Sequence, residues 1–184
     1  MADNKKFKQV EINTDLAMDI EQILNGGFSP LTTFLDKKSL DSVLEHMRLP
    51  TGEIWPIPIL FPQKNDESIN SLDSLLLKFQ GHDFAVLEEP ETFEYDLDKL
   101  ITSFYGTNDE NHPGVQISRK SPYIFITGKL RGINKLNKIL DINYLEPQDV
   151  KNIIKEKHWK SIVGFHTRNP PHSAHEYIHK SVLK

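Results

Sequence analysis

A short apolar run leads into a polar turn near the C-terminus, where residues 161–176 read SIVGFHTRNPPHSAHE. The apolar residues 161–165 are typical of a buried strand. A helical pattern opened by Pro147 precedes them, and a second helical pattern begins about Pro171 and continues to the end of the chain. Helix, buried strand, polar turn and helix in this order predict the start of a parallel α/β domain.

The preceding 140 residues have a different character, because short helical and strand patterns alternate there. Apolar residues at helical spacing follow three capping residues, Thr14, Asp36 and about Asp96. Strand patterns occupy Ser74–Phe79 and Asp83–Glu88, joined as a hairpin, then Tyr123–Leu130, while the proline-containing stretch 54–61 fits an edge strand or an irregular extended segment. This mixture predicts a compact, partly barrel-like α+β domain.

Composition excludes several classes of protein. The 184 residues carry a net charge of −4 and no cysteine, so disulfides, thiolate zinc sites, Fe–S clusters and cysteine nucleophiles are excluded. The N-terminal residues MADNKK lack the apolar segment of a secretory signal, and no apolar run is long enough to span a bilayer. A cytoplasmic protein is therefore expected, with neither a membrane nor a nucleic acid as its partner.

The polar turn carries the residues with chemical potential. Ligands of open α/β sheets bind beyond the carboxyl ends of the strands, where this turn would lie. With Pro171 at the first helical position, His172 and His175 fall in the first turn on one helix face. A helix N-terminus favours a bound anion, two imidazoles can donate hydrogen bonds to phosphate oxygens, and Arg168 adds a planar cationic fork.

Such a cluster suits nucleotidyl transfer, in which negative charge builds up on the oxygen that leaves with pyrophosphate. A metal site is the competing interpretation, because His172, His175 and His179 stand at positions i, i+3 and i+7. That spacing lacks the glutamate of HExxH and any cysteine. No metal-ligating residue is therefore predicted.

The same segment resembles the signature of the ATP sulfurylase (sulfate adenylyltransferase) family, which reads roughly F-Q-T-R-N-P-x-H-R-A-H-E. Further stretches resemble the family's N-terminal domain: LNGGFSPL at 24–31, MRLPTG at 47–52, WPIP at 55–58 and YGTNDENHPGV at 105–115. Their order and spacing agree from about residue 14 to the C-terminus.

This resemblance implies a fold and a division of the chain. Residues 1–145 would form a PUA-like pseudo-barrel of the α+β class. Residues 146–184 would contain a linker helix and then the opening strand and helix of an α/β nucleotidyltransferase domain of the HxGH class. The family's catalytic domain continues well beyond the signature, so the resemblance implies an N-terminal fragment that is inactive alone.

The resemblance also implies a reaction and roles for the signature residues. The family joins ATP and sulfate, with Mg²⁺, to give adenosine 5′-phosphosulfate and pyrophosphate, a step of sulfate assimilation. Thr167, Arg168 and Asn169 would belong to the sulfate and α-phosphate site, and His166 would stand beside them as a substrate-binding residue. His172 and His175 would contact the ATP phosphates and stabilise the transition state.

Three positions depart from the family pattern. His166 replaces a usual glutamine, which makes anion binding sensitive to pH. Ser173 replaces a usual arginine and so removes a positive charge from the start of the helix. His158 stands where the family often has glycine, at a helix C-terminus that favours a left-handed residue.

Two alternatives remain open at this point. The chain could be a non-catalytic PUA-like binding or interaction module, or a related nucleotidyltransferase that uses another oxyanion. A homo-oligomer also remains open, because Ala174, Ile178 and Val182 would give the last helix an apolar face in need of a partner.

Overall fold

The computed structural model describes residues 6–64 and 68–183. The chain divides into two compact units, Met1–Pro147 and Gln148–Lys184, and each is described by itself. No helix among the described residues is both long and apolar enough to cross a membrane.

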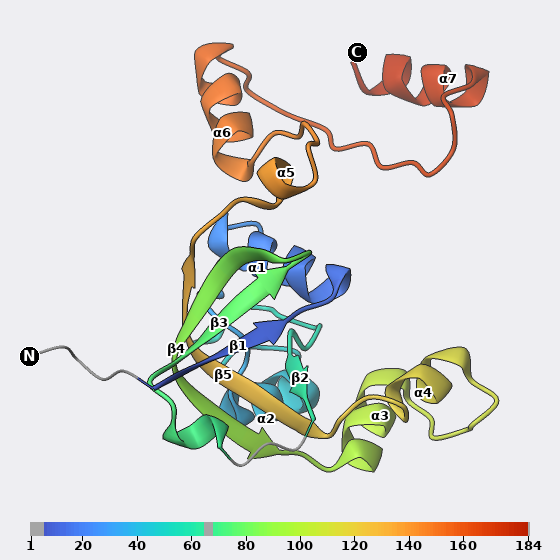
Figure 1. Ribbon diagram of the computed structural model, residues 1–184. Coiled ribbons are helices and arrows are strands. Elements are labelled where there is room, and N and C mark those ends of the chain that lie inside the picture. The colour runs from blue at the N-terminus through green and yellow to red at the C-terminus, as the bar shows by residue number, and fades with distance from the viewer. Residues whose placement is uncertain (1–5, 65–67, 184) are drawn as a thin grey trace, which may run out of the picture. The chain divides into compact units, whose positions relative to one another are not determined.

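The first unit is built on one mixed sheet that curls into a half-barrel (Figure 1). Its strands are β1 (Phe7–Glu11), β2 (Phe61–Gln63), β3 (Ser74–Phe79), β4 (His82–Glu94) and β5 (Ile124–Gly132). Their order across the sheet is β1-β3-β4-β5-β2. Strand β1 pairs parallel with β3, and the other pairs are antiparallel. The α+β class predicted from the alternating patterns is confirmed.

Short helices connect these strands. They are α1 (Thr14–Leu24), α2 (Lys37–His46), the 3-10 turn η1 (Ile69–Ser71), α3 (Leu97–Tyr105), α4 (Pro113–Ser118) and α5 (Leu136–Ile139). The caps predicted at Asp36 and Asp96 are confirmed, since their carboxylates accept hydrogen bonds from the first-turn amides of α2 and α3. The cap predicted at Thr14 is wrong. Asn13 holds that position instead, accepting from the Leu16 amide at 2.9 Å, and Thr14 is the first helical residue.

The hairpin is confirmed, although its second strand is longer than predicted. Gln80 and Gly81 both have positive φ and close the turn between β3 and β4. Strand β4 continues past Glu88 to Glu94 because a bulge, with Glu89 at φ 50°, shifts its register on β5 and lets it follow the curl. Opposite the bulge, a Cβ on Gly128 would lie 2.7 Å from the Glu88 carbonyl oxygen, so the backbones approach closely there.

The main core lies between α1 and the sheet. Leu75, Leu77 and Phe79 alternate along β3 and are all buried, as a half-buried strand requires. They share one apolar cluster with Ala17 and Ile20 of α1, both fully buried. The proline-containing stretch 54–61 is mostly irregular, with an isolated bridge between Ile54 and Arg48, and its last residue opens the edge strand β2 (Phe61–Gln63). Both features agree with the prediction.

A buried carboxylate fastens the end of this unit to α1. Glu21 is 5% exposed and accepts hydrogen bonds from the Leu136 amide at 3.2 Å and from the Tyr144 hydroxyl. Burial and the Glu21 carboxylate both raise the pKa of the Tyr144 hydroxyl. Lys135 also forms an ion pair with Glu146 at 2.5 Å. Residues 135–146 are therefore held by polar contacts as well as by the packing of Leu136.

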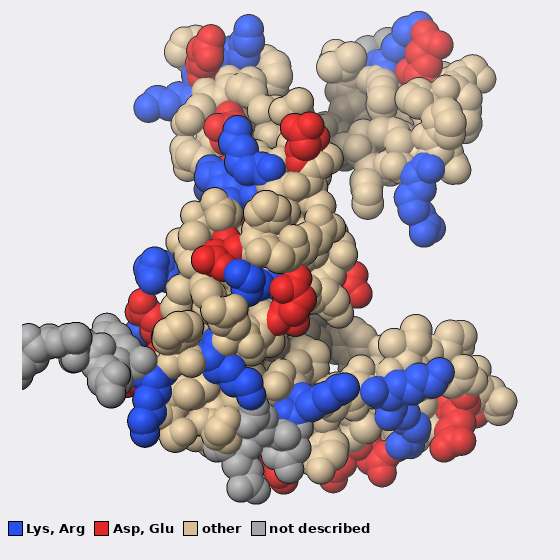
Figure 2. Space-filling view, viewed as in Figure 1, with Lys and Arg blue, Asp and Glu red and all other residues tan. Residues whose placement is uncertain are grey.

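Basic and acidic side chains are interspersed on the face seen in Figure 2. In β5, Lys129 pairs with Glu89 at 2.6 Å and Arg131 pairs with Glu88 at 3.2 Å. Both pairs are exposed and each contributes little to stability.

The second unit contains α7 (Ser173–Val182) and all of α6 (Pro147–Glu156) except its first residue, and neither helix has a buried residue. The helix predicted to open at Pro147 is confirmed. His158 has φ 53°, so it adopts the left-handed conformation expected after the end of this helix.

The buried strand predicted at residues 161–165 is wrong. This segment forms no strand, and Ile162 and Val163 are 53% and 63% exposed. A buried parallel strand needs neighbouring strands on both sides for its amides and carbonyls, and no described strand pairs with these residues. The segment still keeps the side-chain alternation of an extended chain. Ser161, Val163 and Phe165 line a groove with Ile178 and Val182 of α7.

Candidate functional site

The candidate site begins in the polar turn that follows Phe165. His166, Arg168 and Asn169 are exposed there. The Thr167 hydroxyl accepts a hydrogen bond from the Asn169 amide at 3.1 Å and donates to the Asn169 carbonyl at 3.2 Å. This local turn fixes the backbone around Arg168. Within the described part of the chain, the Arg168 guanidinium forms no ion pair.

The two signature histidines cap the start of α7 in a reciprocal way. His172 is the N-cap, and its Nδ1 accepts a hydrogen bond from the Ala174 amide at 3.3 Å. His175 reaches back, so that its Nδ1 accepts from the His172 amide at 3.2 Å. The arrangement is a capping box in which imidazoles replace the usual hydroxyl and carboxylate.

The helix therefore begins later than predicted. Pro171 does not occupy its first position, which belongs to Ser173. The reason is the reciprocal cap, because His172 must keep extended backbone, with φ −140° and ψ 179°, to offer its amide to His175. Placing His172 and His175 together at the start of the helix is nevertheless correct. Their rings lie 3.9 Å apart between centroids, with 34° between the planes.

The caps decide which ring nitrogens remain available. A ring nitrogen that accepts a hydrogen bond carries no proton, so the neutral His172 and His175 rings carry theirs on Nε2. Each ring then presents one N–H donor that the cap does not use. Two such donors beside a helix N-terminus form a suitable binding arrangement for phosphate oxygens.

The Phe165 ring, which precedes the turn in sequence, packs against two histidines of α7, His175 and His179. It meets His175 edge-on at 5.4 Å and His179 edge-on at 4.3 Å. The sequence reasoning considered His179 only as a metal ligand and missed this packing contact. The i, i+4 spacing of His175 and His179 is the signal that could have revealed one shared neighbour.

The structure thus brings together two parts of the predicted site and leaves a third apart. His172 and His175 are in contact, and Thr167 and Asn169 are hydrogen-bonded to each other. Among the described residues, no hydrogen bond joins Arg168 or His166 to either histidine.

Metal binding finds little support in the side chains. Across residues 6–64 and 68–183, no group of three histidines or carboxylates is arranged to hold a metal ion. Mg²⁺ prefers carboxylate and phosphate oxygens. The nearest carboxylate in α7, Glu176, is engaged in an ion pair with Lys180. The residues of this turn therefore do not form a magnesium site by themselves.

Comparisons with known proteins find family matches in two parts of the chain. Residues 1–135 match the family model described as a PUA-like domain, and residues 142–184 match the model described as ATP-sulfurylase. Two curated relatives, one from Halothermothrix orenii and one from Persephonella marina, are named sulfate adenylyltransferase. Each is 36% identical to this chain, and the alignments cover 97% and 98% of it. A Pyrococcus abyssi protein with the same name is 32% identical over the whole chain.

The chain spans about half the length of these relatives, 48% in each of the three. A solved structure described as a hexameric APS kinase from Thiobacillus denitrificans superposes with a TM-score of 0.67 at 17% identity. That match covers 96% of this chain and 32% of the other, and at this identity it establishes the fold alone.

Proposed function

The chain belongs to the PUA-like domain family, and from that premise we propose that it is the N-terminal part of a sulfate adenylyltransferase. We propose that residues 1–145 form the PUA-like domain and that residues 146–184 begin a nucleotidyltransferase domain of the HxGH class. The relatives that match across the whole chain support this enzyme over a non-catalytic interaction module. The cytoplasmic location and a homo-oligomeric state stay predictions.

The observation that carries the proposal is the reciprocal capping at the start of α7, in which Nδ1 of His172 and of His175 accept backbone hydrogen bonds and Nε2 of each ring is left as the donor. In the proposed reaction a sulfate oxygen attacks the α-phosphorus of ATP. The bond from that phosphorus to the bridging oxygen breaks, and pyrophosphate leaves with the electron pair. Donors held beside the phosphates stabilise the charge that develops on the leaving group.

The remaining signature residues would bind the two anions before the reaction. Arg168 has no competing carboxylate among the described residues, so its guanidinium is available to pair with sulfate or the α-phosphate. Thr167 fixes the turn on which Arg168 and Asn169 stand. His166 would add one further donor to the same site.

Mg²⁺ would arrive with ATP as part of the substrate. The turn lacks a set of carboxylates that would bind the ion independently, so the triphosphate would supply its ligands. When bound, the ion neutralises phosphate charge. The residues of this chain bind and orient the anions.

The test fuses this chain to the C-terminal part of a relative, which this chain does not match. Fused at Lys184 to the C-terminal part of the Halothermothrix orenii relative, the chain should release pyrophosphate from ATP only when sulfate is present. The 184-residue chain alone should show no sustained release, because a single turn and helix cannot enclose ATP. Turnover by the isolated chain would contradict the assignment as a part of the enzyme.

Matched variants of the fusion locate the chemistry. Arg168→Ala should lower kcat/KM at least 100-fold. His172→Asn keeps a good N-cap but removes the imidazole, so it should lower activity at least tenfold while the ¹³Cα shifts of α7 stay helical. Lys180→Gln, on the same helix, is the control and should change activity less than twofold. A folded fusion that binds ATP without sulfate-dependent pyrophosphate release would refute the proposed function.

A further inference from the structure

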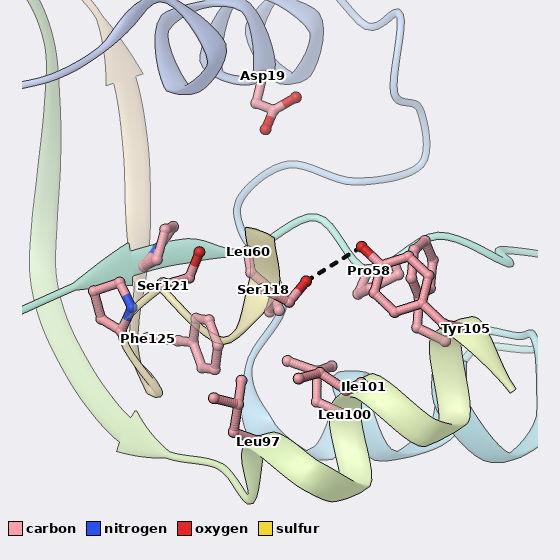
Figure 3. Close-up of a pocket in the computed structure, with 13 residues that line it drawn as sticks. Asp19, Pro58, Leu60, Leu97, Leu100, Ile101, Tyr105, Ser118, Ser121 and Phe125 are labelled. Atoms are coloured by element: carbon pink, nitrogen blue, oxygen red, sulfur yellow. Dashed lines mark hydrogen bonds between the residues drawn. The ribbon is translucent and has the colours of Figure 1, made fainter. Parts of the chain in front are cut away.

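The first unit contains a cavity lined by residues between Asp19 and Phe125, none of which belongs to the polar turn. The cavity measures about 240 Å³ and lies beside α3 and β5 (Figure 3). Its walls are largely apolar and are contributed mainly by Leu60, Leu97, Leu100, Phe104 and Phe125. Small-molecule sites in proteins combine such walls with a few polar groups. This cavity also has polar residues in its lining.

Two kinds of polar group line the cavity. At one side the Tyr105 and Ser118 hydroxyls lie 3.2 Å apart and share a hydrogen bond. From α1, the Asp19 carboxylate points toward the other lining residues, as Figure 3 shows. The cavity therefore presents one negative charge and three hydroxyls, those of Tyr105 and Ser118, which are hydrogen-bonded to each other, and that of Ser121.

The Asp19 charge is unbalanced within the structure. Across the described ranges 6–64 and 68–183, its carboxylate forms no hydrogen bond and no ion pair. Burial raises the pKa of Asp19, and the like charge of Asp15 one turn earlier raises it further. Like charges at i, i+4 also destabilise a helix. A positive charge near Asp19 would relieve both costs.

These features select one class of ligand. An anion would be repelled by Asp19, and a neutral apolar molecule would leave the carboxylate without a partner. A divalent cation needs several oxygen ligands, whereas the remaining walls are mostly apolar. We propose that this cavity binds a small organic amine, with its ammonium group at Asp19 and its apolar body against Leu97, Leu100 and Phe125.

The size of the cavity limits the ligand further. Pockets for drug-sized molecules measure roughly 300–1,000 Å³, so a cavity of about 240 Å³ suits a single small ring with a short side chain. The site lies wholly in the first unit and does not depend on the proposed enzyme activity. Its test therefore measures binding and not turnover.

The probe is 2-phenylethylamine, titrated into the ¹⁵N-labelled 184-residue chain, with 2-phenylethanol as the uncharged control of matching shape. The amine should shift the amide signals of α3 and of residues 118–125 in a saturable way. The alcohol should bind at least tenfold more weakly, because it cannot form the ion pair. Equal binding of both probes, or shifts confined to other regions, would overturn the proposal.

Three variants separate the site from general charge attraction. Asp19→Asn should weaken amine binding at least tenfold while leaving the fold intact, since it also removes a like-charge repulsion. Asp15→Asn makes the same charge change on the same helix at an exposed position outside the cavity, and should weaken binding less than threefold. Leu97→Trp should fill the cavity and abolish binding. Equal losses in the two aspartate variants would show nonspecific attraction and would overturn the proposal.

Discussion

The hydroxyl of Tyr144 donates a hydrogen bond to the buried Glu21 carboxylate. Replacing Tyr144 with phenylalanine removes one of the two donors to a carboxylate that is 5% exposed. The free energy of unfolding should fall by about 1–3 kcal/mol, measured by urea denaturation. Tyr177→Phe is the matched control, because its ring is 74% exposed, and it should change stability by less than about 0.5 kcal/mol. Equal effects of the two substitutions would contradict the assigned role.

The same hydroxyl makes stability depend on pH in the alkaline range. Burial and the neighbouring Glu21 raise the pKa of Tyr144 above its ordinary value of 10.0. Above pH 10 the unfolded tyrosine loses its proton while the folded one keeps it, so unfolding releases protons and stability falls as pH rises. The contribution is fully present below pH 10.

Denaturation at pH 8 and at pH 11 measures this dependence. The wild-type chain should lose more stability between the two values than Tyr144→Phe does. Tyr95, whose pKa is raised by burial and by Asp41, is present in both proteins and cancels in the difference. Identical pH slopes would show that Tyr144 does not titrate differently in the folded state.

At the scale of residues, the sequence predicted the pairing of the two histidines but not the residue at which α7 begins. The pairing of His172 with His175 follows from their spacing, which is the same wherever the helix begins. The position of the cap does not follow from spacing, because Pro171 is compatible both with the first helical turn and with the residue before the cap. The side-chain hydrogen bonds of the two rings decide between them.

At the scale of elements, the close approach of β4 and β5 makes a side chain at Gly128 unfavourable. A Cβ there would meet the Glu88 carbonyl oxygen at 2.7 Å and Leu87 Cγ at 3.0 Å. Since one of these neighbours is backbone, Gly128→Ala should cost about 1–3 kcal/mol of unfolding free energy.

Gly132→Ala in the same strand is the control for this prediction. Its Cβ would meet only the flexible end of the Leu24 side chain, at 3.1 Å, so stability should change by less than about 1 kcal/mol. Thermal unfolding of the two variants compares them directly. A tolerant Gly128 would show that the bulge opposite it can relax.

Elements with local signals could be predicted and elements with distant partners could not. The β3–β4 hairpin follows from alternation and a Gln-Gly turn, both within a few residues. Residues 161–165 carry the composition of a buried strand, yet a strand also requires neighbours that composition does not supply. The extension of β4 beyond Glu88 depends on a bulge against β5, which lies thirty or more residues away in the chain.

At the scale of the whole chain, the two units differ in how much they bury. The first holds a continuous apolar cluster, whereas α6 and α7 contain no buried residue. Short helices that bury none of their residues are marginally stable in water. Amides of α6 and α7 should therefore exchange with deuterium within seconds at neutral pH, while those of β3 and β4 stay protected for hours. Mass spectrometry of peptic fragments checks this, and slow exchange in α7 would contradict it.

The parallel pairing of β1 with β3 has a consequence for how the chain folds. Phe7 lies opposite Ser74, so the chain must close a long loop before this pair forms, whereas β3 and β4 meet across two residues. Local pairs form faster than distant ones. During synthesis on a ribosome, β1 therefore waits without a partner until β3 has emerged from the exit tunnel, and it joins the nascent sheet late.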